Sequence, residues 1–241
     1  MKLENMVVAV TGAGRGIGRA LAVGLAREGA KVVVCSRSSK ELAETARLAS
    51  KAAPQGKQSI LYMKVDITKE QDCALWAKAI KDQFGKLDAL VNNAGVLGKL
   101  APISEYPYPV FKDVINVNVI GTYCVTKAVL SGLMLEQKSG TIINISSGVA
   151  KKGRALWGAY SISKFATEGF NQILALELAD KGVKVFALNP GGTRTDMRAE
   201  ACPQEDPNKV KGPEALVGPI VKLITEGKIE DTGKSYELGE I

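Results

Sequence analysis

The 241-residue sequence contains no histidine and only four cysteines, Cys35, Cys73, Cys124 and Cys202. The cysteines are widely spaced, and none belongs to a Cys-x-x-Cys pair. A structural zinc site or a redox dithiol needs clustered thiol or imidazole groups, and a Ser-His-Asp triad needs a histidine base. The composition therefore argues against all three kinds of site, and we expect no metal ligands in this chain.

Long apolar runs are also missing, although 46% of the residues are hydrophobic. A helix that crosses a membrane needs roughly 18 or more predominantly apolar residues, and we find no run near that length. The first residues already read as a strand, without a charged and then apolar leader. We therefore expect a soluble, cytoplasmic protein with no membrane partner.

The formal net charge of +7 raises the question of nucleic-acid binding. The basic residues are spread over the expected helix surfaces, and the main cluster, Lys151-Lys152, has no interleaved aromatic residues. This pattern is typical of a solvated basic surface, so we expect no nucleic-acid partner. The same excess of Lys and Arg would help an anionic cofactor or substrate to approach.

Strand-like and helix-like segments alternate along the chain, with no linker, repeat or low-complexity stretch between them. This alternation predicts an α/β fold: a single-domain, Rossmann-type, doubly wound parallel sheet of about seven strands with helices on both faces. One domain spanning residues 1–241 is the natural count for this length. The expected strands lie near residues 6–11, 31–35, 59–66, 87–91, 140–146, 183–189 and 234–238.

The first of these strands runs directly into four alternating glycines, Gly12, Gly14, Gly16 and Gly18, which lead into a helical segment. Glycines let the backbone turn tightly beside a pyrophosphate, and the positive end of the following helix favours negative charge. The spacing departs from the usual Gly-x-Gly-x-x-Gly fingerprint. A flexible surface turn is the alternative, but the strand at 31–35 completes a βαβ unit, which favours a phosphate site.

Tyr160 and Lys164 stand four residues apart in a helical segment, so their side chains share one face. A free tyrosine has a pKa of about 10 and exchanges protons poorly at neutral pH, whereas an adjacent ammonium favours its phenolate. The pair would serve as a general acid and base. The spacing alone also arises by chance on amphipathic helices, so its significance depends on companion motifs such as Ser147, thirteen residues before Tyr160.

These motifs resemble the classical short-chain dehydrogenase/reductase family, and the resemblance runs along nearly the whole chain. They follow the family's order: Thr11-Gly12-x-x-x-Gly16-x-Gly18, Asn92-Asn-Ala-Gly95, Asn118, Ser147, Tyr160-x-x-x-Lys164 and Asn189-Pro-Gly-Gly-Thr-Arg-Thr195. Two stretches, Gly153-Arg-x-x-Trp-Gly-Ala-Tyr and Pro190-Gly-Gly-Thr-Arg-Thr-x-Met-Arg, are most similar to a bacterial oxidoreductase branch whose substrate is undefined.

The resemblance implies an oxidoreductase that transfers hydride between a nicotinamide and a carbonyl or alcohol carbon. Tyr160 would exchange the proton, and Ser147 would bind the carbonyl oxygen. Lys164 would hold the nicotinamide ribose and lower the pKa of Tyr160, while Asn118 would position a water in the proton relay. Ser147 could instead be a turn serine at the end of a strand, and Asn118 a buried helix asparagine bonded to the backbone. Ser146 and Asn116 are competitors of the same type, but the family's thirteen-residue offset from Tyr160 selects Ser147, and its Asn-Val-Ile-Gly motif selects Asn118.

The end of the second strand bears on the choice of cofactor. NAD-dependent enzymes usually carry Asp or Glu there for the ribose 2′-hydroxyl, whereas this chain has Ser36-Arg37 and no acid before Glu41. The Arg37 guanidinium fits a 2′-phosphate, and Arg15 in the glycine loop would close on it from the other side. We therefore expect NADP(H) to be preferred over NAD(H), unless both arginines are plain surface charges.

Further cofactor contacts follow from the resemblance. Asp66-Ile67, after the third strand, resembles the family's adenine-contacting pair; a helix N-cap is the alternative role for Asp66. The candidate cofactor-binding residues are Gly12, Arg15, Gly16, Ile17, Gly18, Ser36, Arg37, Asp66, Ile67, Asn93, Ala94, Gly95, Tyr160, Lys164, Pro190, Thr193 and Thr195.

The motifs do not define the substrate. We expect Val96-Leu97 and the segments 148–157 and 192–212 to line its pocket, because a long proline-containing loop after a strand commonly acts as a lid. The segment 192–212 carries both basic and acidic residues, so its charge indicates no substrate class. Arg154 and Trp157 favour an aromatic or anionic group, unless Trp157 packs in the core or at an interface.

Three functional classes remain open: an NADP(H)-dependent carbonyl reductase, an epimerase or dehydratase that uses the same tyrosine, and an NADP(H)-binding sensor or scaffold without net turnover. The retained Tyr160 and Lys164 favour the first, acting on a small-molecule carbonyl or alcohol. The family usually assembles through two long helices, here at 107–137 and 158–181, so we expect a homodimer or homotetramer. The segment from Thr232 onwards lacks the Asp-Gly-Gly ending common in the family, which puts the second tetramer contact in doubt.

Overall fold

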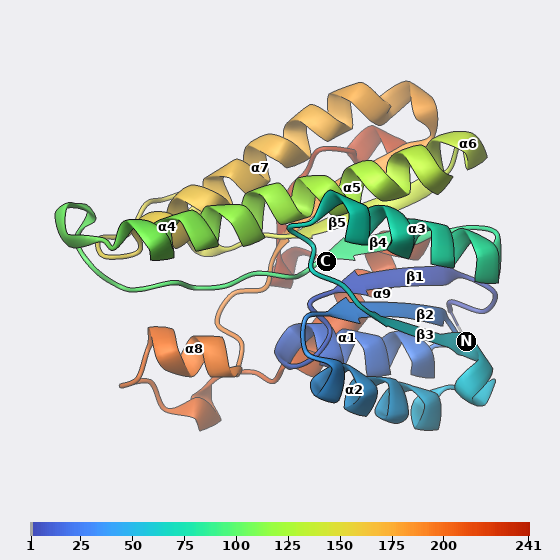
Figure 1. Cartoon of the computed structure of the whole chain (residues 1–241), viewed down its shortest axis with the longest axis horizontal. Helices are drawn as coiled ribbons and strands as arrows, with labels where there is room; N and C mark the ends of the chain where they lie inside the picture. The colour runs from blue at the N-terminus through green and yellow to red at the C-terminus, as the bar shows by residue number, and fades with distance from the viewer. Residues whose placement is uncertain (1) are drawn as a thin grey trace.

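The computed structural model describes residues 2–241, apart from the side chains of Lys57 and Gln58. One seven-stranded parallel sheet runs through the protein in the order β3-β2-β1-β4-β5-β6-β7 (Figure 1). This confirms the expected fold class, and each strand lies within two residues of its expected bounds. The strands are β1 (Val7–Thr11), β2 (Lys31–Ser36), β3 (Ile60–Lys64), β4 (Ala89–Asn92), β5 (Gly140–Ile145), β6 (Val183–Asn189) and β7 (Ser235–Glu237).

The central strands are apolar on both faces because both faces are covered. All five residues of β1 are buried. Val8 and Val10 belong to the core on one side of the sheet, whereas Val7 and Ala9 belong to the core on the other side. Such continuous burial is typical of parallel strands between two helical layers. The edge strand β3 instead carries side chains that are partly exposed, as Tyr62 shows.

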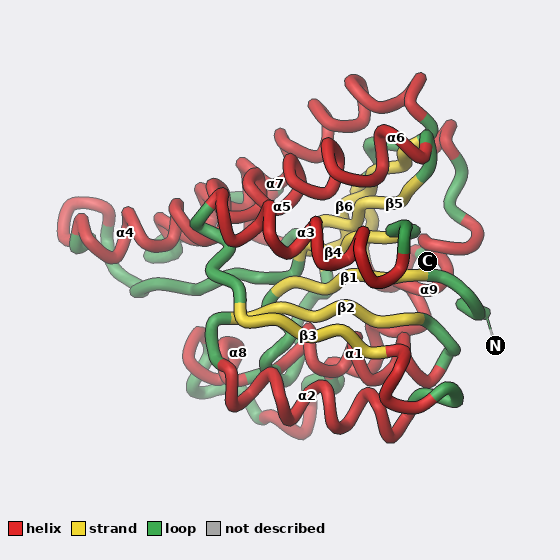
Figure 2. The backbone as a smooth tube through the Cα atoms, turned by 45° about the vertical axis from the view of Figure 1, so that its right-hand side comes forward, coloured by secondary structure: helices red, strands yellow, loops and turns green. Residues whose placement is uncertain are grey.

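Two layers of helices enclose the sheet (Figure 2). One layer consists of α1 (Gly16–Arg27), α2 (Ser39–Ala52) and α9 (Val217–Glu226). The opposite layer consists of α3 (Glu70–Phe84), the long helix that contains α4, α5 and α6, and α7 (Gly158–Leu178). The short helix α8 (Asp196–Ala201) follows β6 and stands apart from both layers (Figure 1).

The long helix contains α4 (Tyr108–Ile115), α5 (Thr122–Val129) and α6 (Leu135–Gln137), joined by two π-helical segments. It is long and apolar enough to cross a membrane by length and composition, with a mean hydropathy of 1.3 over 18 residues. It corresponds to the long helix expected at 107–137. It holds no uninterrupted apolar run of that length, because polar and charged residues such as Lys112, Asp113 and Lys127 interrupt the apolar ones. Half of that window is buried in the fold, where the helix packs on α3 and α7, and core helices also pass this test.

The order of the strands reverses between β1 and β4. From β1 the chain moves outward to β2 and β3, and it then returns to β4 on the other side. In doubly wound sheets, ligands bind in the crevice at the carboxyl ends of the strands at such a switch point. The segments that follow β1, β4, β5 and β6 all leave the sheet at this edge. These segments carry most of the motifs identified in the sequence.

Candidate active site

The loop after β1 requires glycine at two positions for different reasons. Gly12 has a φ of +65°, and a Cβ there would lie 2.6 Å from the Cα of Ala94. Gly18 lies in α1, but its Cβ would lie 2.5 Å from the carbonyl oxygen of Gly12 and 2.6 Å from Nδ2 of Asn93. Because both methyl groups are absent, the loop lies directly against the segment that follows β4.

Hydrogen bonds connect the two sides of the switch point. The Asn93 and Ala94 amides both donate to the Thr11 hydroxyl at 3.0 Å. Nδ2 of Asn93 also donates to the Thr11 carbonyl at 2.9 Å. The Asn-Asn-Ala-Gly motif therefore holds the glycine loop in place by backbone and side-chain contacts.

The first turn of α1 is open to an anion. Its N-cap residue, Arg15, makes no side-chain capping bond, and the first turn contains no acidic residue. The first amides of a helix lack intrahelical acceptors and carry the positive end of the macrodipole, so a phosphate would be stabilised there. The Arg15 guanidinium meets Asp196 at 3.2 Å, and this exposed ion pair joins the glycine loop to α8.

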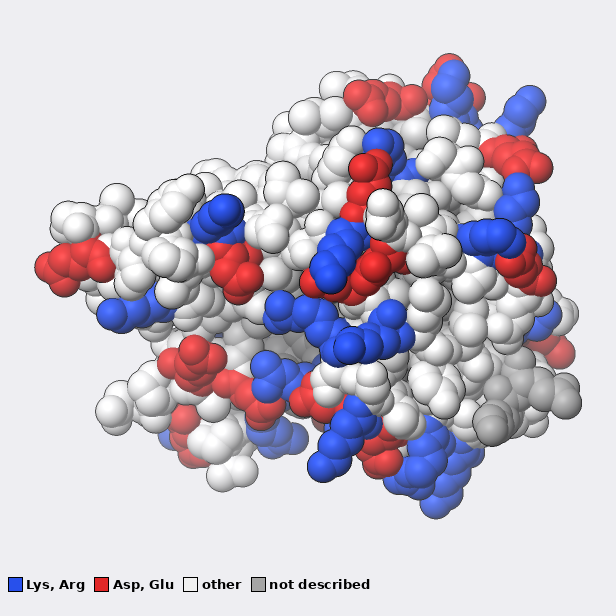
Figure 3. Space-filling model, in the orientation of Figure 1, with Lys and Arg blue, Asp and Glu red and all other residues white. Residues whose placement is uncertain are grey.

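A cavity of about 610 Å³ opens at this edge of the sheet, a volume in the usual range for cofactor sites. Figure 3 shows several Lys and Arg side chains around a hollow on this face. Most of the candidate cofactor-binding residues line the cavity: Gly12, Arg15, Gly16, Ile17, Ser36, Arg37, Asp66, Ile67, Asn93, Ala94, Gly95, Tyr160, Lys164, Pro190 and Thr195. The candidate residues that do not line it are Gly18, Asn118, Ser147 and Thr193.

Asp66 lies in the cavity wall after β3 and is held by its own chain. Its Oδ1 accepts hydrogen bonds from the Thr68 amide at 3.1 Å and the Thr68 hydroxyl at 2.8 Å. Burial acts to raise the pKa of Asp66, but these hydrogen bonds, together with Lys69 and Arg37, lower it overall. The N-cap of α3 is Lys69, so Asp66 caps a turn before the helix and is not the N-cap itself.

Glu41 reaches the cavity, although sequence reasoning noted it only as the next acid after Arg37. A Cβ on Gly14 would lie 3.1 Å from Oε2 of Glu41 and 3.1 Å from Oγ of Ser36. The carboxylate therefore lies beside the glycine loop, next to the residues expected to bind a 2′-phosphate. The signal was available in the sequence, because side chains in the first turn of a helix lean back toward its N-terminus.

Tyr160 lies near the start of α7, half-buried in the wall of the cavity. Burial raises the pKa of Tyr160, while a hydrogen bond with the Ser147 side chain acts in the opposite direction. Ser146 is 1% exposed, and its hydroxyl donates a hydrogen bond to Glu168 of α7. Ser146 lines the cavity and Ser147 does not, but the Ser146 hydroxyl is engaged by Glu168.

Lys164 lies one turn further along α7 and is only 7% exposed. Its Nζ donates to the Ile145 carbonyl at 2.7 Å and lies 5.7 Å from the centroid of the Tyr160 ring. Burial lowers the pKa of Lys164 to about 8, against the opposing field of Glu168. The expected lowering of the Tyr160 pKa by Lys164 is not found in the chain alone, because the ammonium is directed at the carbonyl and burial of the phenol dominates.

Asn118 is 4% exposed and lies in the first π-helical segment of the long helix. Its Oδ1 accepts from the Val96 amide at 2.8 Å, and its Nδ2 donates to the Val96 carbonyl at 3.0 Å. Nδ2 also donates to the Ser163 hydroxyl at 2.9 Å. The side chain therefore ties the segment after β4 to α7, which is the bonding of a buried structural asparagine.

The segment after β6 is folded by local hydrogen bonds. The Thr193 hydroxyl is buried and donates to the Pro190 carbonyl at 3.3 Å. Oγ1 of Thr195 accepts from the Arg198 amide at 3.2 Å and caps α8. Pro190 and Thr195 thus reach the cavity wall, whereas Thr193 supports the turn from behind.

Trp157 and Arg154 adjoin the site from the segment before α7. Trp157 is 8% exposed, and its ring centroid lies 6.0 Å from that of Tyr160. The guanidinium carbon of Arg154 lies 5.1 Å from the centroid of the Trp157 ring. Trp157 therefore packs against Tyr160, while Arg154 is exposed.

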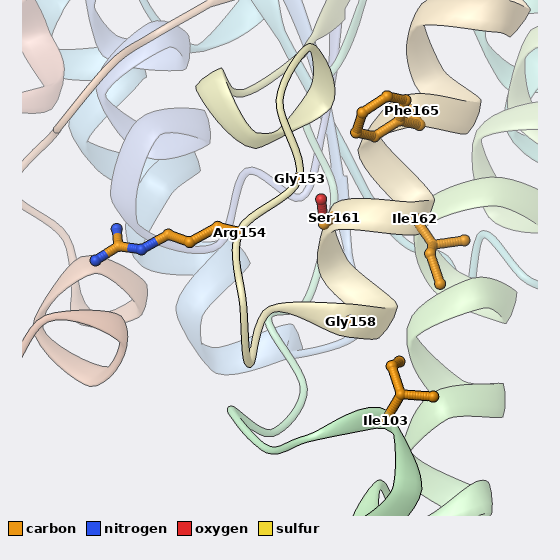
Figure 4. Close-up of a pocket in the computed structure, with 7 residues that line it drawn as sticks. All are labelled: Ile103, Gly153, Arg154, Gly158, Ser161, Ile162 and Phe165. Atoms are coloured by element: carbon orange, nitrogen blue, oxygen red, sulfur yellow. The ribbon is translucent and has the colours of Figure 1, made fainter.

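A second, shallower pocket of about 440 Å³ lies on the outer face of α7 (Figure 4). Ile103, Ile162 and Phe165 give it an apolar wall. Figure 4 shows the Arg154 side chain pointing away from these three residues. This pocket is separate from the glycine-lined cavity.

The fold, the glycine loop at the switch point and the cavity beside Tyr160 define a Rossmann-type α/β protein with a nucleotide-sized site. The chain belongs to the short chain dehydrogenase family, whose sequence profile matches residues 6–206. A curated relative, the uncharacterized oxidoreductase YciK of Escherichia coli strain K12, is 38% identical over 235 residues, covering 98% of this chain and 92% of the relative.

Two further comparisons agree with this assignment. A 3-oxoacyl-[acyl-carrier-protein] reductase of Synechocystis is 39% identical over 229 residues, covering 93% of this chain and 91% of the relative. The crystal structure of a short chain dehydrogenase from Shigella flexneri 2a strain 301, complexed with NADP, matches with a TM-score of 0.92 at 36% identity and covers 98% of both chains. The resemblance expected from the motifs is confirmed, and the protein is an oxidoreductase of this family.

Proposed function

We propose that the protein transfers hydride between NADP(H) and a carbonyl or alcohol substrate, with Tyr160 as general acid and base. The observation that carries this proposal is that Tyr160 and Lys164 line the same cavity as the glycine loop and Arg37. The Ser147 side chain lies close enough to Tyr160 to oppose the rise of its pKa. One cavity thus combines groups that suit a phosphate with groups that suit proton transfer.

The residues present fit a dinucleotide. Gly12 and Gly18 leave a groove that side chains would fill, and the open amides at the start of α1 suit the pyrophosphate. When bound, the nicotinamide supplies or accepts the hydride. Asp66 and the residues after β4 would enclose the adenosine and the nicotinamide ribose.

The residues of the chain divide the remaining tasks. In the reducing direction, Tyr160 donates its proton to the carbonyl oxygen of the substrate as negative charge develops there. Ser147 donates a hydrogen bond to the same oxygen, and Lys164 holds the nicotinamide ribose and supplies positive charge. We propose that Asn118 acts indirectly: it fixes Val96, next to the nicotinamide end, instead of meeting the substrate.

NADP(H) is the proposed preferred cofactor. Arg37 and Arg15 line the cavity, and β2 ends without the acid that an NAD-binding site usually places there. The similar Shigella flexneri protein was crystallised with NADP. Glu41 acts against this preference, because its carboxylate would repel a 2′-phosphate. We therefore propose a preference for NADP(H) that still allows NAD(H) to bind.

The test is oxidation of NADPH and NADH, side by side, with a panel of aldehydes, ketones and 3-oxoacyl thioesters. The thioesters are included because the Synechocystis relative is a 3-oxoacyl reductase. We expect turnover that prefers NADPH and falls at least roughly 100-fold in Tyr160→Phe, while NADPH still binds. Saturable NADPH binding without any turnover would contradict a reductase and favour a sensor, and an epimerised or dehydrated product would favour the other alternative.

We propose that the protein forms a homodimer or homotetramer through the long helix and α7. Both carry large apolar side chains that are exposed in the single chain, with Tyr108 at 73% and Leu176 at 83%. Other members of the same faces are Ile120, Tyr123, Ile162, Phe165 and Ile173. Sedimentation of the wild type should show an oligomer, and a monomer at all concentrations would contradict the proposal.

We also propose a cytoplasmic location and one functional unit over residues 1–241. All four cysteines are free thiols, which agrees with a reducing compartment. Burial raises the pKa of Cys73 to about 12, so this thiol stays protonated and unreactive. Fractionation of the native host should recover the protein in the cytosol, and recovery with the membranes would contradict this location.

A further inference from the structure

Glu168 lies on α7 one turn after Lys164, and the proposed mechanism gives it no role. Its Oε1 accepts a hydrogen bond from the Ser146 hydroxyl, directly after β5. The same oxygen accepts from the Ser235 hydroxyl, at the start of β7, at 3.0 Å. One carboxylate thus joins α7 to segments on both sides of β6, immediately behind the cavity.

Lys164 depends on the same corner of the sheet. Its Nζ donates to the Ile145 carbonyl, and Ile145 directly precedes Ser146. A neutral carbonyl satisfies one proton of an ammonium but does not neutralise its charge, and a buried charge is costly without a counter-charge. The carboxylate of Glu168 is the negative group held one helical turn away, on the same face of α7.

We propose that Glu168 is a positioning residue for Lys164. Its fixed negative charge keeps the buried ammonium protonated, and its hydrogen bond to Ser146 fixes the end of β5, whose Ile145 carbonyl receives that ammonium. The inference rests on the proposed function in one respect, namely that Lys164 acts in the reaction.

The electrostatics point the same way. Burial lowers the pKa of Lys164 to about 8, and the charge of Glu168 raises it. Tyr160 and Glu168 are the titratable groups of α7 that act on Lys164, and β5 contributes the neutral Ile145 carbonyl. The Ser235 hydroxyl of β7 bonds to Glu168 and is neutral as well. Lys164 is cationic below its pKa and becomes neutral as the pH rises through it. Removing the Glu168 charge therefore moves the loss of the cation to lower pH.

The experiment compares Glu168→Gln with Glu177→Gln. The first change keeps the size and the acceptor oxygen but removes the charge, and the second removes an exposed charge from the same helix. The titration of Lys164 is followed by NMR of protein labelled with ¹³Cε-lysine, with the signal assigned from Lys164→Met. We expect the midpoint in E168Q to fall by about half a pH unit or more, while E177Q matches the wild type. Equal midpoints in all three proteins would overturn the proposal.

Activity provides a second readout and separates two kinds of failure. The upper pH limit of kcat/KM should move down in E168Q by the same amount as the Lys164 midpoint. A shifted midpoint without turnover on any carbonyl would support the positioning role and contradict the proposed reaction. Turnover with an unshifted Lys164 midpoint would support the proposed reaction and contradict the positioning role. Glu168→Asp keeps the charge and serves as the test if E168Q does not fold. The Lys164 midpoint in E168D must stay close to that of the wild type, and a large fall would also overturn the proposal.

Discussion

Substitution of Gly18 by alanine tests whether the glycine loop and the segment after β4 are as closely packed as the structure indicates. The new Cβ would lie 2.5 Å from the Gly12 carbonyl oxygen and 2.6 Å from Nδ2 of Asn93. Neither contact is tolerable, so the loop or Asn93 must move. Both movements would disturb the end of α1 that faces the cavity.

The magnitude follows from three contributions. Overpacking of a tight site costs about 1–3 kcal/mol. Displacement of Asn93 would break its bonds to the Thr11 and Gly12 carbonyls, at about 0.5–1.5 kcal/mol each. Alanine in a helix gains back about 0.5–1 kcal/mol. We therefore expect Gly18→Ala to lower the free energy of unfolding by about 1–5 kcal/mol.

Gly218→Ala is the matched control, because Gly218 also lies in a helix, α9, and its Cβ would meet nothing within 4 Å. Urea denaturation followed by circular dichroism gives both free energies of unfolding, and NADPH fluorescence gives the dissociation constants. We expect G218A to be neutral or slightly stabilising and G18A to be less stable and to bind NADPH more weakly. Wild-type stability and affinity in G18A would refute the close packing of the loop.

Three further predictions follow from the site and the surface. Glu41→Gln should tighten NADPH binding several-fold without improving NADH binding, because it removes a negative charge beside the 2′-phosphate. The repulsion removed is about 1 kcal/mol at a partly exposed site. Equal effects on both dissociation constants would show that Glu41 does not face the phosphate. Burial raises the pKa of Tyr160, so the phenol stays protonated at neutral pH in the chain alone. Alcohol oxidation needs the phenolate and should therefore accelerate as the pH rises toward the Lys164 pKa of about 8, and a flat rate profile below that pH would argue against this acid and base. Leu176→Glu should shift sedimentation toward the monomer if its face of α7 is an oligomer contact, and an unchanged sedimentation coefficient would place the interface elsewhere.

Local sequence patterns predicted the sheet, part of the cavity wall and the family. The alternation of apolar strands and amphipathic helices predicted the parallel sheet within two residues at each strand, because burial on both faces leaves a continuous apolar signature. The glycines after β1 and the Tyr160-x-x-x-Lys164 spacing identified the cavity wall, because tight turns and helical periodicity are short-range properties of the chain. The family follows from the same motifs in the same order.

The tertiary structure alone decided how these groups act on one another. Glu168 meets Ser146 and Ser235, 22 and 67 positions away in the sequence, and no short-range pattern indicates such a contact. The bonding of Asn118 to Val96 likewise depends on the long helix lying beside the segment after β4. Burial, which only packing creates, raises the pKa of Tyr160 where the isolated Tyr-Lys pair predicted a decrease. Sequence periodicity records which face of an element is apolar, whereas the protonation of a group depends on everything that surrounds it in space.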